Sequence, residues 1–329
     1  MFLGSQTRSS LDFAKRYHLE SPSHDALNIL SAKAAQPATR VGFAVPDGAC
    51  DCHVHLFGDP QRYPFASGRV YTPETASIAE LRACLDALHM DRVVIVQPSV
   101  YGTDNRCTVD AVRELGRRAR GVAVVDANTP DAALDDMAAA GIRGVRLNLM
   151  TAGVSDPSVA LQAFTTAAER ASKRKWHIQL NTSLKLIDAI RSQLQASPVP
   201  VVFDHFGGAA ASAGVQQPGF EALVALVKSG TAYVKISGAA DSVSKRAPDY
   251  PDVSPLARAL VGANRQRILW GSNWPHPDSA RVAGRKNTDI APLMQTDDGR
   301  VLNLLAEWVP DAAVRRSILV ENPARLYGF

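Results

Sequence analysis

The stretch Asp51-Cys52-His53-Val54-His55 opens the part of the chain that decides the fold. Alternate side chains of a strand point to the same face, so His53 and His55 share one face. Two imidazoles at the end of a strand form a polar site that can bind a divalent ion or hydrogen-bond a substrate carbonyl. Solvent-facing histidines often show the same spacing, so the rest of the chain has to distinguish these alternatives.

From residue 50 onward, short β-branched runs alternate with segments whose apolar residues recur at helical spacing. The expected strands lie at 51–55, 93–97, 121–125, 145–149, 177–181, 201–205, 233–237 and 268–271. Eight β/α units of this size favour an α/β protein with a closed (β/α)8 TIM barrel. A doubly wound open sheet is the alternative, but no glycine-rich dinucleotide motif follows the first strand.

Polar residues lie where these strands end. In a parallel barrel those ends meet at one face, where active sites are built. The sequence therefore predicts one site there, made from His53, His55, Gln97, Ser99, Arg146, Asn148, Asn181, His205, Ser237 and Asn273. Strand alternation further predicts that Asp204, beside His205, points away from the barrel axis. Lys235 has the inward parity of Ser237 and is expected to form a buried ion pair.

Composition limits the classes of function. The chain has 329 residues, of which 46% are hydrophobic and 21% charged, which is typical of a globular protein with a large core. The net charge of +4 is spread along the chain, so no nucleic-acid partner is expected. No run approaches the roughly 18 apolar residues of a membrane span, and the N-terminus lacks the apolar segment of a secretory signal. We expect a cytoplasmic enzyme with no membrane partner.

Residues 1–46 precede the alternating pattern and are rich in Ser, Ala, Lys and Arg. We expect them to form an N-terminal arm that wraps the body or a neighbouring subunit of a homo-oligomer, with plain disorder as the alternative. Residues 47–329 are expected to form the catalytic barrel domain.

Seven segments, in this order, resemble the amidohydrolase superfamily. The resemblance covers roughly residues 47–329. Within the superfamily, the segments resemble more specifically the branch of 2-pyrone-4,6-dicarboxylate lactonase, 4-sulfomuconolactone hydrolase and galactarolactone isomerase. The segments are DCHVHLFG (51–58), VVIVQPSVYGTDN (93–105), GIRGVRLNLM (141–150), VVFDHFG (201–207), YVKISG (233–238), ILWGSNWPHP (268–277) and ENPARLYGF (321–329).

The resemblance implies an enzyme that acts on a small anionic lactone. It gives His53 and His55 the place of the family's first-strand histidines, and His205 that of the histidine that polarises the lactone carbonyl. Arg146 falls on an arginine that holds a substrate carboxylate, and Tyr71 on a substrate-contacting tyrosine. We therefore expect His53, His55, His205 and Asn273 to be catalytic, and Tyr71, Ser99, Arg146, Asn148, Asn181 and His276 to bind substrate.

Asn273 departs from the pattern of the hydrolases, which carry an aspartate there that takes the proton from the attacking water. An amide cannot do so. Asparagine resembles the isomerase branch, in which a substrate hydroxyl is the nucleophile. A hydrolase of a carboxylated or sulfonated lactone, a lactone isomerase and an inactive binding barrel thus stay open. In a hydrolase, His55 or His276 is expected to be the base, with an ionisation near the usual histidine pKa of about 6.5. A second departure is Asp241, which stands where the pyrone lactonase has an arginine.

No metal is expected to be required. Metal-binding members of the superfamily add a lysine or glutamate after the fourth strand, a histidine after the fifth, or both, and these strands end here in Asn148 and Asn181. Zinc remains the alternative, because His53, His55 and His205 could hold it.

Overall fold

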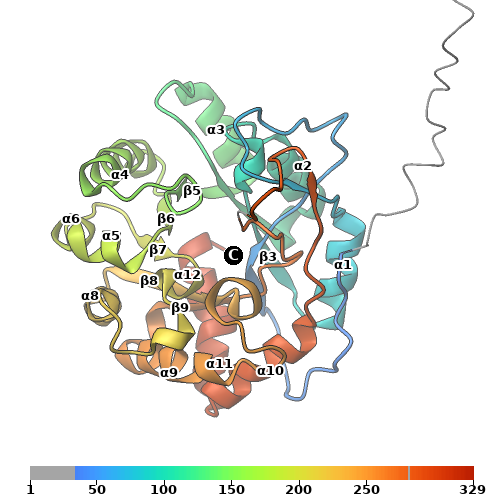
Figure 1. Cartoon of the computed structure of the whole chain (residues 1–329), viewed down its shortest axis with the longest axis vertical. Helices are drawn as coiled ribbons and strands as arrows, with labels where there is room; N and C mark the ends of the chain where they lie inside the picture. The colour runs from blue at the N-terminus through green and yellow to red at the C-terminus, as the bar shows by residue number, and fades with distance from the viewer. Residues whose placement is uncertain (1–33, 281) are drawn as a thin grey trace, which may run out of the picture. The chain divides into compact units, whose positions relative to one another are not determined.

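The computed structural model describes residues 34–280 and 282–329. Its centre is an eight-stranded sheet of parallel strands that pair in chain order. Backbone hydrogen bonds from Asn273 N to His53 O (2.9 Å) and from His55 N to Trp274 O (2.8 Å) join the carboxyl end of the first strand to the segment that follows the last strand. The expected (β/α)8 barrel is confirmed, and Figure 1 shows the helices arranged around the sheet. The strands are β1 Cys50–Val54, β3 Arg92–Val96, β4 Ala119–Ala123, β5 Ile142–Asn148, β6 His177–Asn181, β7 Val201–Phe203, β8 Ala232–Ser237 and β9 Ile268–Gly271.

Helices connect successive strands and follow the last one, and several of them bury an apolar stripe. Helix α1 (Ile78–Ala87) illustrates the pattern, because Ser77 and Glu80 form a capping box at its start and Leu81, Cys84 and Leu85 are buried. The other helices are α2 Arg106–Leu115, α3 Asp131–Ala140, α4 Pro157–Ser172, α5 Leu184–Ala189, α6 Arg191–Gln195, α7 His205–Gly208, α8 Phe220–Lys228, α9 Ser254–Ala263, α10 Asp298–Trp308, α11 Ala312–Arg316 and α12 Asn322–Tyr327. A separate two-stranded sheet joins β2 Thr72–Pro73 to β10 Ile290–Ala291.

The expected strands all exist, although some bounds move by a few residues. Strand β5, expected at 145–149, starts three residues earlier at Ile142, which pairs with Gly121 of β4. Strand β4, expected at 121–125, starts two residues earlier because Ala119 and Arg120 pair with Val93 and Val94 of β3. Alanine and arginine carry little strand signal of their own, so only the pairing with a neighbour reveals this start.

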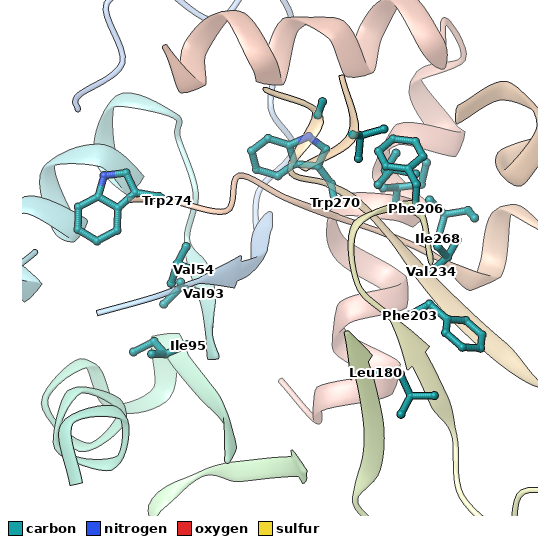
Figure 2. Close-up of a cluster of buried hydrophobic side chains, with 14 of the residues drawn as sticks. Val54, Val93, Ile95, Leu180, Phe203, Phe206, Val234, Ile268, Trp270 and Trp274 are labelled. Atoms are coloured by element: carbon teal, nitrogen blue, oxygen red, sulfur yellow. The ribbon is translucent and has the colours of Figure 1, made fainter. Parts of the chain in front are cut away.

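The barrel is filled by apolar side chains at one end and polar side chains at the other. Tyr327 of α12 packs with inward-facing residues of several strands, among them Cys50, Val122 and Leu269, and all of these are buried. This plug lies at the end of the barrel where the strands begin. A second apolar layer lies between sheet and helices, and Figure 2 shows part of it, including Ile95 and Trp270.

Most of the expected N-terminal arm, residues 1–33, lies outside the described residues, so its expected role in a homo-oligomer stays a prediction. The described part of the arm is held by hydrogen bonds to the barrel domain: Thr39 N to Asp297 Oδ2 (3.0 Å) and Gly42 N to Asn303 Oδ1 (2.7 Å). The arm boundary at residue 46 stays a prediction. Within the described ranges no helix is both long and apolar enough to cross a membrane.

Candidate active site

A cavity of about 650 Å³ opens at the carboxyl ends of the barrel strands. Of the ten residues predicted to be catalytic or to bind substrate, seven line it: His55, Tyr71, Ser99, Arg146, Asn181, His205 and Asn273. The other three do not. His53 is fully buried, Asn148 stands outside the lining, and His276 is fully buried among carboxylates. The structure thus brings seven of the predicted residues to the cavity wall and leaves His53, Asn148 and His276 away from it.

The two first-strand histidines point at one another. Their Nε2 atoms lie 3.3 Å apart, and Nδ1 of His55 lies 2.7 Å from the carbonyl oxygen of Val96. A carbonyl only accepts, so His55 carries a proton on Nδ1 and presents a lone pair on Nε2. Burial, with help from the nearby Arg146 charge, lowers the pKa of His55 to about 3. Burial also lowers the pKa of His53, so both rings are neutral near pH 7.

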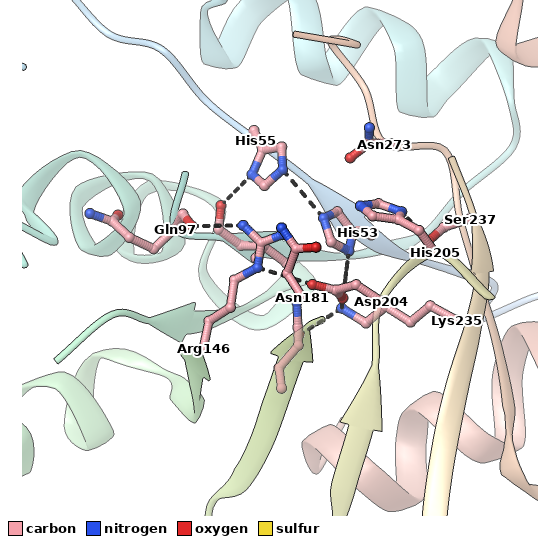
Figure 3. A network of polar contacts seen from close by, with 12 residues as sticks. His53, His55, Gln97, Arg146, Asn181, Asp204, His205, Lys235, Ser237 and Asn273 are labelled. Atoms are coloured by element: carbon pink, nitrogen blue, oxygen red, sulfur yellow. Dashed lines mark hydrogen bonds and ion pairs between the residues drawn. The ribbon is translucent and has the colours of Figure 1, made fainter. Parts of the chain in front are cut away.

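Asp204 lies at the centre of a buried charge network, which corrects the prediction that it points away from the barrel axis. Its Oδ2 accepts from Nε of Arg146 at 3.0 Å, and its Oδ1 lies 3.1 Å from Nδ1 of His53 and 3.6 Å from Nζ of Lys235. Figure 3 shows these groups converging from separate strands. Strand β7 already ends at Phe203, and His205 has a φ of +47°, so simple alternation does not extend to Asp204 and His205.

The expected buried ion pair of Lys235 is present in this network. Its Nζ also donates to Oε1 of Gln179 at 2.7 Å. Burial lowers the pKa of Lys235 to about 8, although Asp204 opposes that shift. Burial alone would raise the pKa of Asp204, but His53, Arg146 and Lys235 together hold it well below its usual value. The network therefore contains an ionised carboxylate matched by at least one cation.

His205 stands beside the first-strand pair. Its ring centroid lies 4.6 Å from that of His53, and its Nδ1 lies 3.0 Å from the hydroxyl of Ser237. Burial lowers the pKa of His205, which makes it neutral near pH 7. It lines the cavity, so a neutral imidazole is available to a bound ligand there.

Asn273 is fixed by a carboxylate that sequence reasoning did not include in the site. Its Nδ2 donates to Oδ2 of Asp241 at 2.8 Å, whereas its Oδ1 is buried and has no partner within the described part of the chain. Figure 3 shows the oxygen on the side of the histidines and the nitrogen turned away from them. The only sign of Asp241 in the sequence was its place where the pyrone lactonase has an arginine.

His276 connects Asp241 to a second carboxylate. Its Nδ1 lies 3.0 Å from Asp241, and its Nε2 lies 3.0 Å from Asp298 of α10. Burial alone would lower the pKa of His276, but Asp298 and Asp241 raise it to about 10. Burial would likewise raise the pKa of Asp241, but His276 and Asn273 hold it below its usual range. The pKa of His55 near 3 and that of His276 near 10 both lie far from the usual histidine value of about 6.5, which argues against either ring as the base of a hydrolase.

The raised pKa of His276 predicts a pH-dependent stability. The folded protein holds a proton on this residue that the unfolded chain loses above a pKa of about 6.5, so stability is present below that value and lost as pH rises towards 10. Between pH 6.5 and 8 we expect the free energy of unfolding to fall by up to about 1.4 kcal/mol per pH unit. Denaturant unfolding of the wild type and of His276→Gln checks this. Parallel pH curves for the two proteins would contradict it.

His53, Asp204 and His205 could hold a metal ion, because each offers one ligand atom and these atoms lie within 4.8 Å of one another. The set differs from the predicted zinc ligands by having Asp204 in place of His55. Imidazole nitrogen and carboxylate oxygen are both zinc ligands, so the donor types fit. Arg146 and Lys235 already contact the Asp204 carboxylate, and they would compete with a metal for it.

Comparison with known proteins gives the family. A family profile described as Amidohydrolase matches residues 50–329. The chain is 34% identical to 4-sulfomuconolactone hydrolase of Rhizobium radiobacter, across 88% of this chain and 92% of that protein. It is 35% identical to a 2-pyrone-4,6-dicarboxylate hydrolase of Comamonas testosteroni (87% and 92% covered). It is 31% identical to D-galactarolactone isomerase of Agrobacterium fabrum (86% and 92% covered).

Among solved structures, the barrel is similar to that of an Agrobacterium tumefaciens protein crystallised without ligand. The TM-score is 0.74 and the sequence identity 29%, with 89% of this chain and 98% of that chain covered. The fold, the site at the strand ends and the match over nearly the whole barrel agree, and this chain belongs to the amidohydrolase family.

Proposed function

We propose that this protein is a hydrolase that opens the ring of a small carboxylated or sulfonated lactone with water. The observation that carries the proposal is the neutral His205 beside the cationic Arg146 in one cavity. A hydrogen-bond donor for the carbonyl oxygen and a cation for an acidic substituent are what such a substrate requires. The names of the relatives, two of them lactone hydrolases, support the same choice.

In this mechanism His205 polarises the lactone carbonyl. If the Ser237 hydroxyl donates to Nδ1, the neutral ring carries its proton on Nε2 and donates it to the carbonyl oxygen. Negative charge builds on that oxygen as water attacks, so this hydrogen bond strengthens in the transition state. Asn273 Oδ1 accepts a hydrogen bond from the attacking water and orients it, without removing its proton.

Arg146 binds the acidic substituent. Its Nε donates to Asp204, and its Nη1 donates to the carbonyl oxygen of Gln97 at 3.4 Å, which leaves Nη2 for a ligand in the cavity. Replacing Arg146 by methionine is expected to raise KM for acidic lactones about 10- to 100-fold, the loss of a charged hydrogen bond, and much less for neutral ones. Steady-state kinetics on a matched acidic and neutral pair measures the effect. Arg146→Lys, which keeps the charge but loses the planar fork, serves as the control, and an equal loss on both substrates would contradict the role.

The metal needs its own test. A divalent ion held by His53, Asp204 and His205 would supply Lewis-acid polarisation of the carbonyl. Because Arg146 and Lys235 already occupy Asp204, we expect kcat to survive dialysis against a chelator, with metal content verified by elemental analysis. Loss of turnover that zinc alone restores would show that the ion is required.

The second candidate is a lactone isomerase, and Asn273 favours it. An amide can orient a substrate hydroxyl as well as it orients water, and one relative is a galactarolactone isomerase. Incubation with a panel of lactones, followed by both proton release and ring interconversion, tests the proposal. Hydrolysis releases acid, isomerisation interconverts rings without acid, and an inactive binding barrel does neither.

A further inference from the structure

Hydrolysis needs a base, and the residues assigned so far do not supply one. Asn273 has no basic form near pH 7. His276 already holds a proton between two carboxylates and does not line the cavity. The negative charge of Asp204 is already paired with Arg146 and Lys235, and these cations together with His53 hold its pKa well below the usual value, which makes it a weak base. The proton of the attacking water must therefore go to another group at the cavity wall.

Asp241 is a carboxylate of the cavity wall with one oxygen that can accept a further hydrogen bond. It comes from the turn Ala239–Val243 that follows β8. Its Oδ2 accepts from Asn273 and His276, whereas its Oδ1 accepts only from the hydroxyl of Ser242, at 2.9 Å, within the described part of the chain. A carboxylate has about four acceptor positions, so Oδ1 has room for a further donor.

The amide oxygen of Asn273 is a second acceptor in a residue that lines the same cavity. Asp241 holds the amide nitrogen, which leaves the amide oxygen buried and without a partner. Buried polar atoms are normally hydrogen-bonded, so this oxygen is suited to accept a hydrogen bond from a bound water or substrate hydroxyl. A water molecule has two protons to donate, one for Asn273 Oδ1 and one for Asp241 Oδ1.

We propose that Asp241 is the general base of this enzyme, a role that rests on the proposed hydrolytic function. The water oxygen bonds to the lactone carbonyl carbon, the carbonyl π pair moves to the oxygen held by His205, and one water proton passes to Asp241 Oδ1. The tetrahedral intermediate then collapses, the ring C–O bond breaks, and the proton passes from Asp241 to the departing ring oxygen. Asp241 is an ionised carboxylate again, and the product is the open hydroxy acid.

In this arrangement His276 and Asp298 are positioning residues. They touch neither water nor substrate. Asp298 holds His276 as an imidazolium, and His276 in turn keeps Asp241 ionised and turned towards Asn273. The carboxylate and the amide together thus do what the family's hydrolases do with one aspartate.

The experiment compares Asp241→Asn with the wild type on 4-sulfomuconolactone, 2-pyrone-4,6-dicarboxylate and galactarolactone. Loss of a general base is expected to lower kcat about 10²- to 10⁴-fold with little change in KM. Asp249→Asn is the matched control, because Asp249 is an exposed carboxylate of the same loop region and pairs with Arg300 at the surface.

Chemical rescue separates a base from a merely structural carboxylate. Asp241→Ala leaves room beside the Asn273 amide and the His276 ring, where formate can bind, and formate is expected to restore turnover in a saturable way. His205→Ala should not respond to formate. Near-normal kcat in Asp241→Asn, or a folded Asp241→Ala that formate does not rescue, would overturn the role of Asp241 alone. A wild type that releases no acid from any of the lactones would overturn the proposed function and this role with it.

Discussion

Replacing His205 by alanine is expected to lower kcat for lactone hydrolysis about 10²- to 10³-fold, as the loss of one donor to a developing oxyanion does. The reason is its position: a neutral imidazole on the cavity wall, fixed by Ser237 at one nitrogen and 4.6 Å from the His53 ring. KM should change much less, because the hydrogen bond gains its strength in the transition state. Steady-state kinetics over a range of lactone concentrations gives both constants.

Two controls accompany this variant. His89→Asn changes an exposed histidine at a positive φ, which asparagine tolerates, and should leave kcat unchanged. Ser237→Ala removes the partner of Nδ1 and should cost less than loss of the whole ring. Near-normal turnover by His205→Ala, on protein shown by thermal unfolding to be folded, would remove His205 from the mechanism.

The second large effect concerns the Asp241–Asn273 pair. Asp241→Asn alone is expected to lose the base, whereas adding Asn273→Asp restores one carboxylate and one amide with their places exchanged. We expect the double variant to hydrolyse lactone at least about tenfold faster than Asp241→Asn, because the general-base contribution of about 10²–10⁴ becomes available again. The measurement is kcat for the four proteins of the double-mutant cycle.

Asn273→Asp alone provides the internal check. Two carboxylates would then share the 2.8 Å contact now made by an amide, so one of them must hold a proton near neutral pH. Its pH–rate profile should gain an ionisation that the wild type lacks. Additive losses across the cycle, with the double variant slower than either single variant, would contradict the exchange of roles.

The barrel could be predicted from the sequence because each strand carries its own local signal. Runs such as 93–97 are apolar and β-branched, and parallel strands bring their polar ends to one face whatever the loops do. That rule alone places His55, Arg146, His205 and Asn273 around one cavity, as observed.

The protonation states of the site could not be predicted, because they depend on contacts between distant loops. Asp241 follows β8, His276 follows β9 and Asp298 begins α10. Only folding brings Asp241 and Asp298 each to 3.0 Å from the ring of His276. The same is true of Asp204, whose inward direction depends on where β7 ends and on the backbone of His205. Strand alternation contains neither piece of information.

The origin of the product oxygen tests the central claim most directly. A single turnover in water enriched in ¹⁸O, followed by mass spectrometry of the product, reports whether solvent attacks the carbonyl. Attack by water gives an open hydroxy acid with one ¹⁸O in its new carboxyl group, and Asp241→Asn is expected to lose this product together with turnover. A rearranged lactone that carries no ¹⁸O would contradict it and make the chain an isomerase.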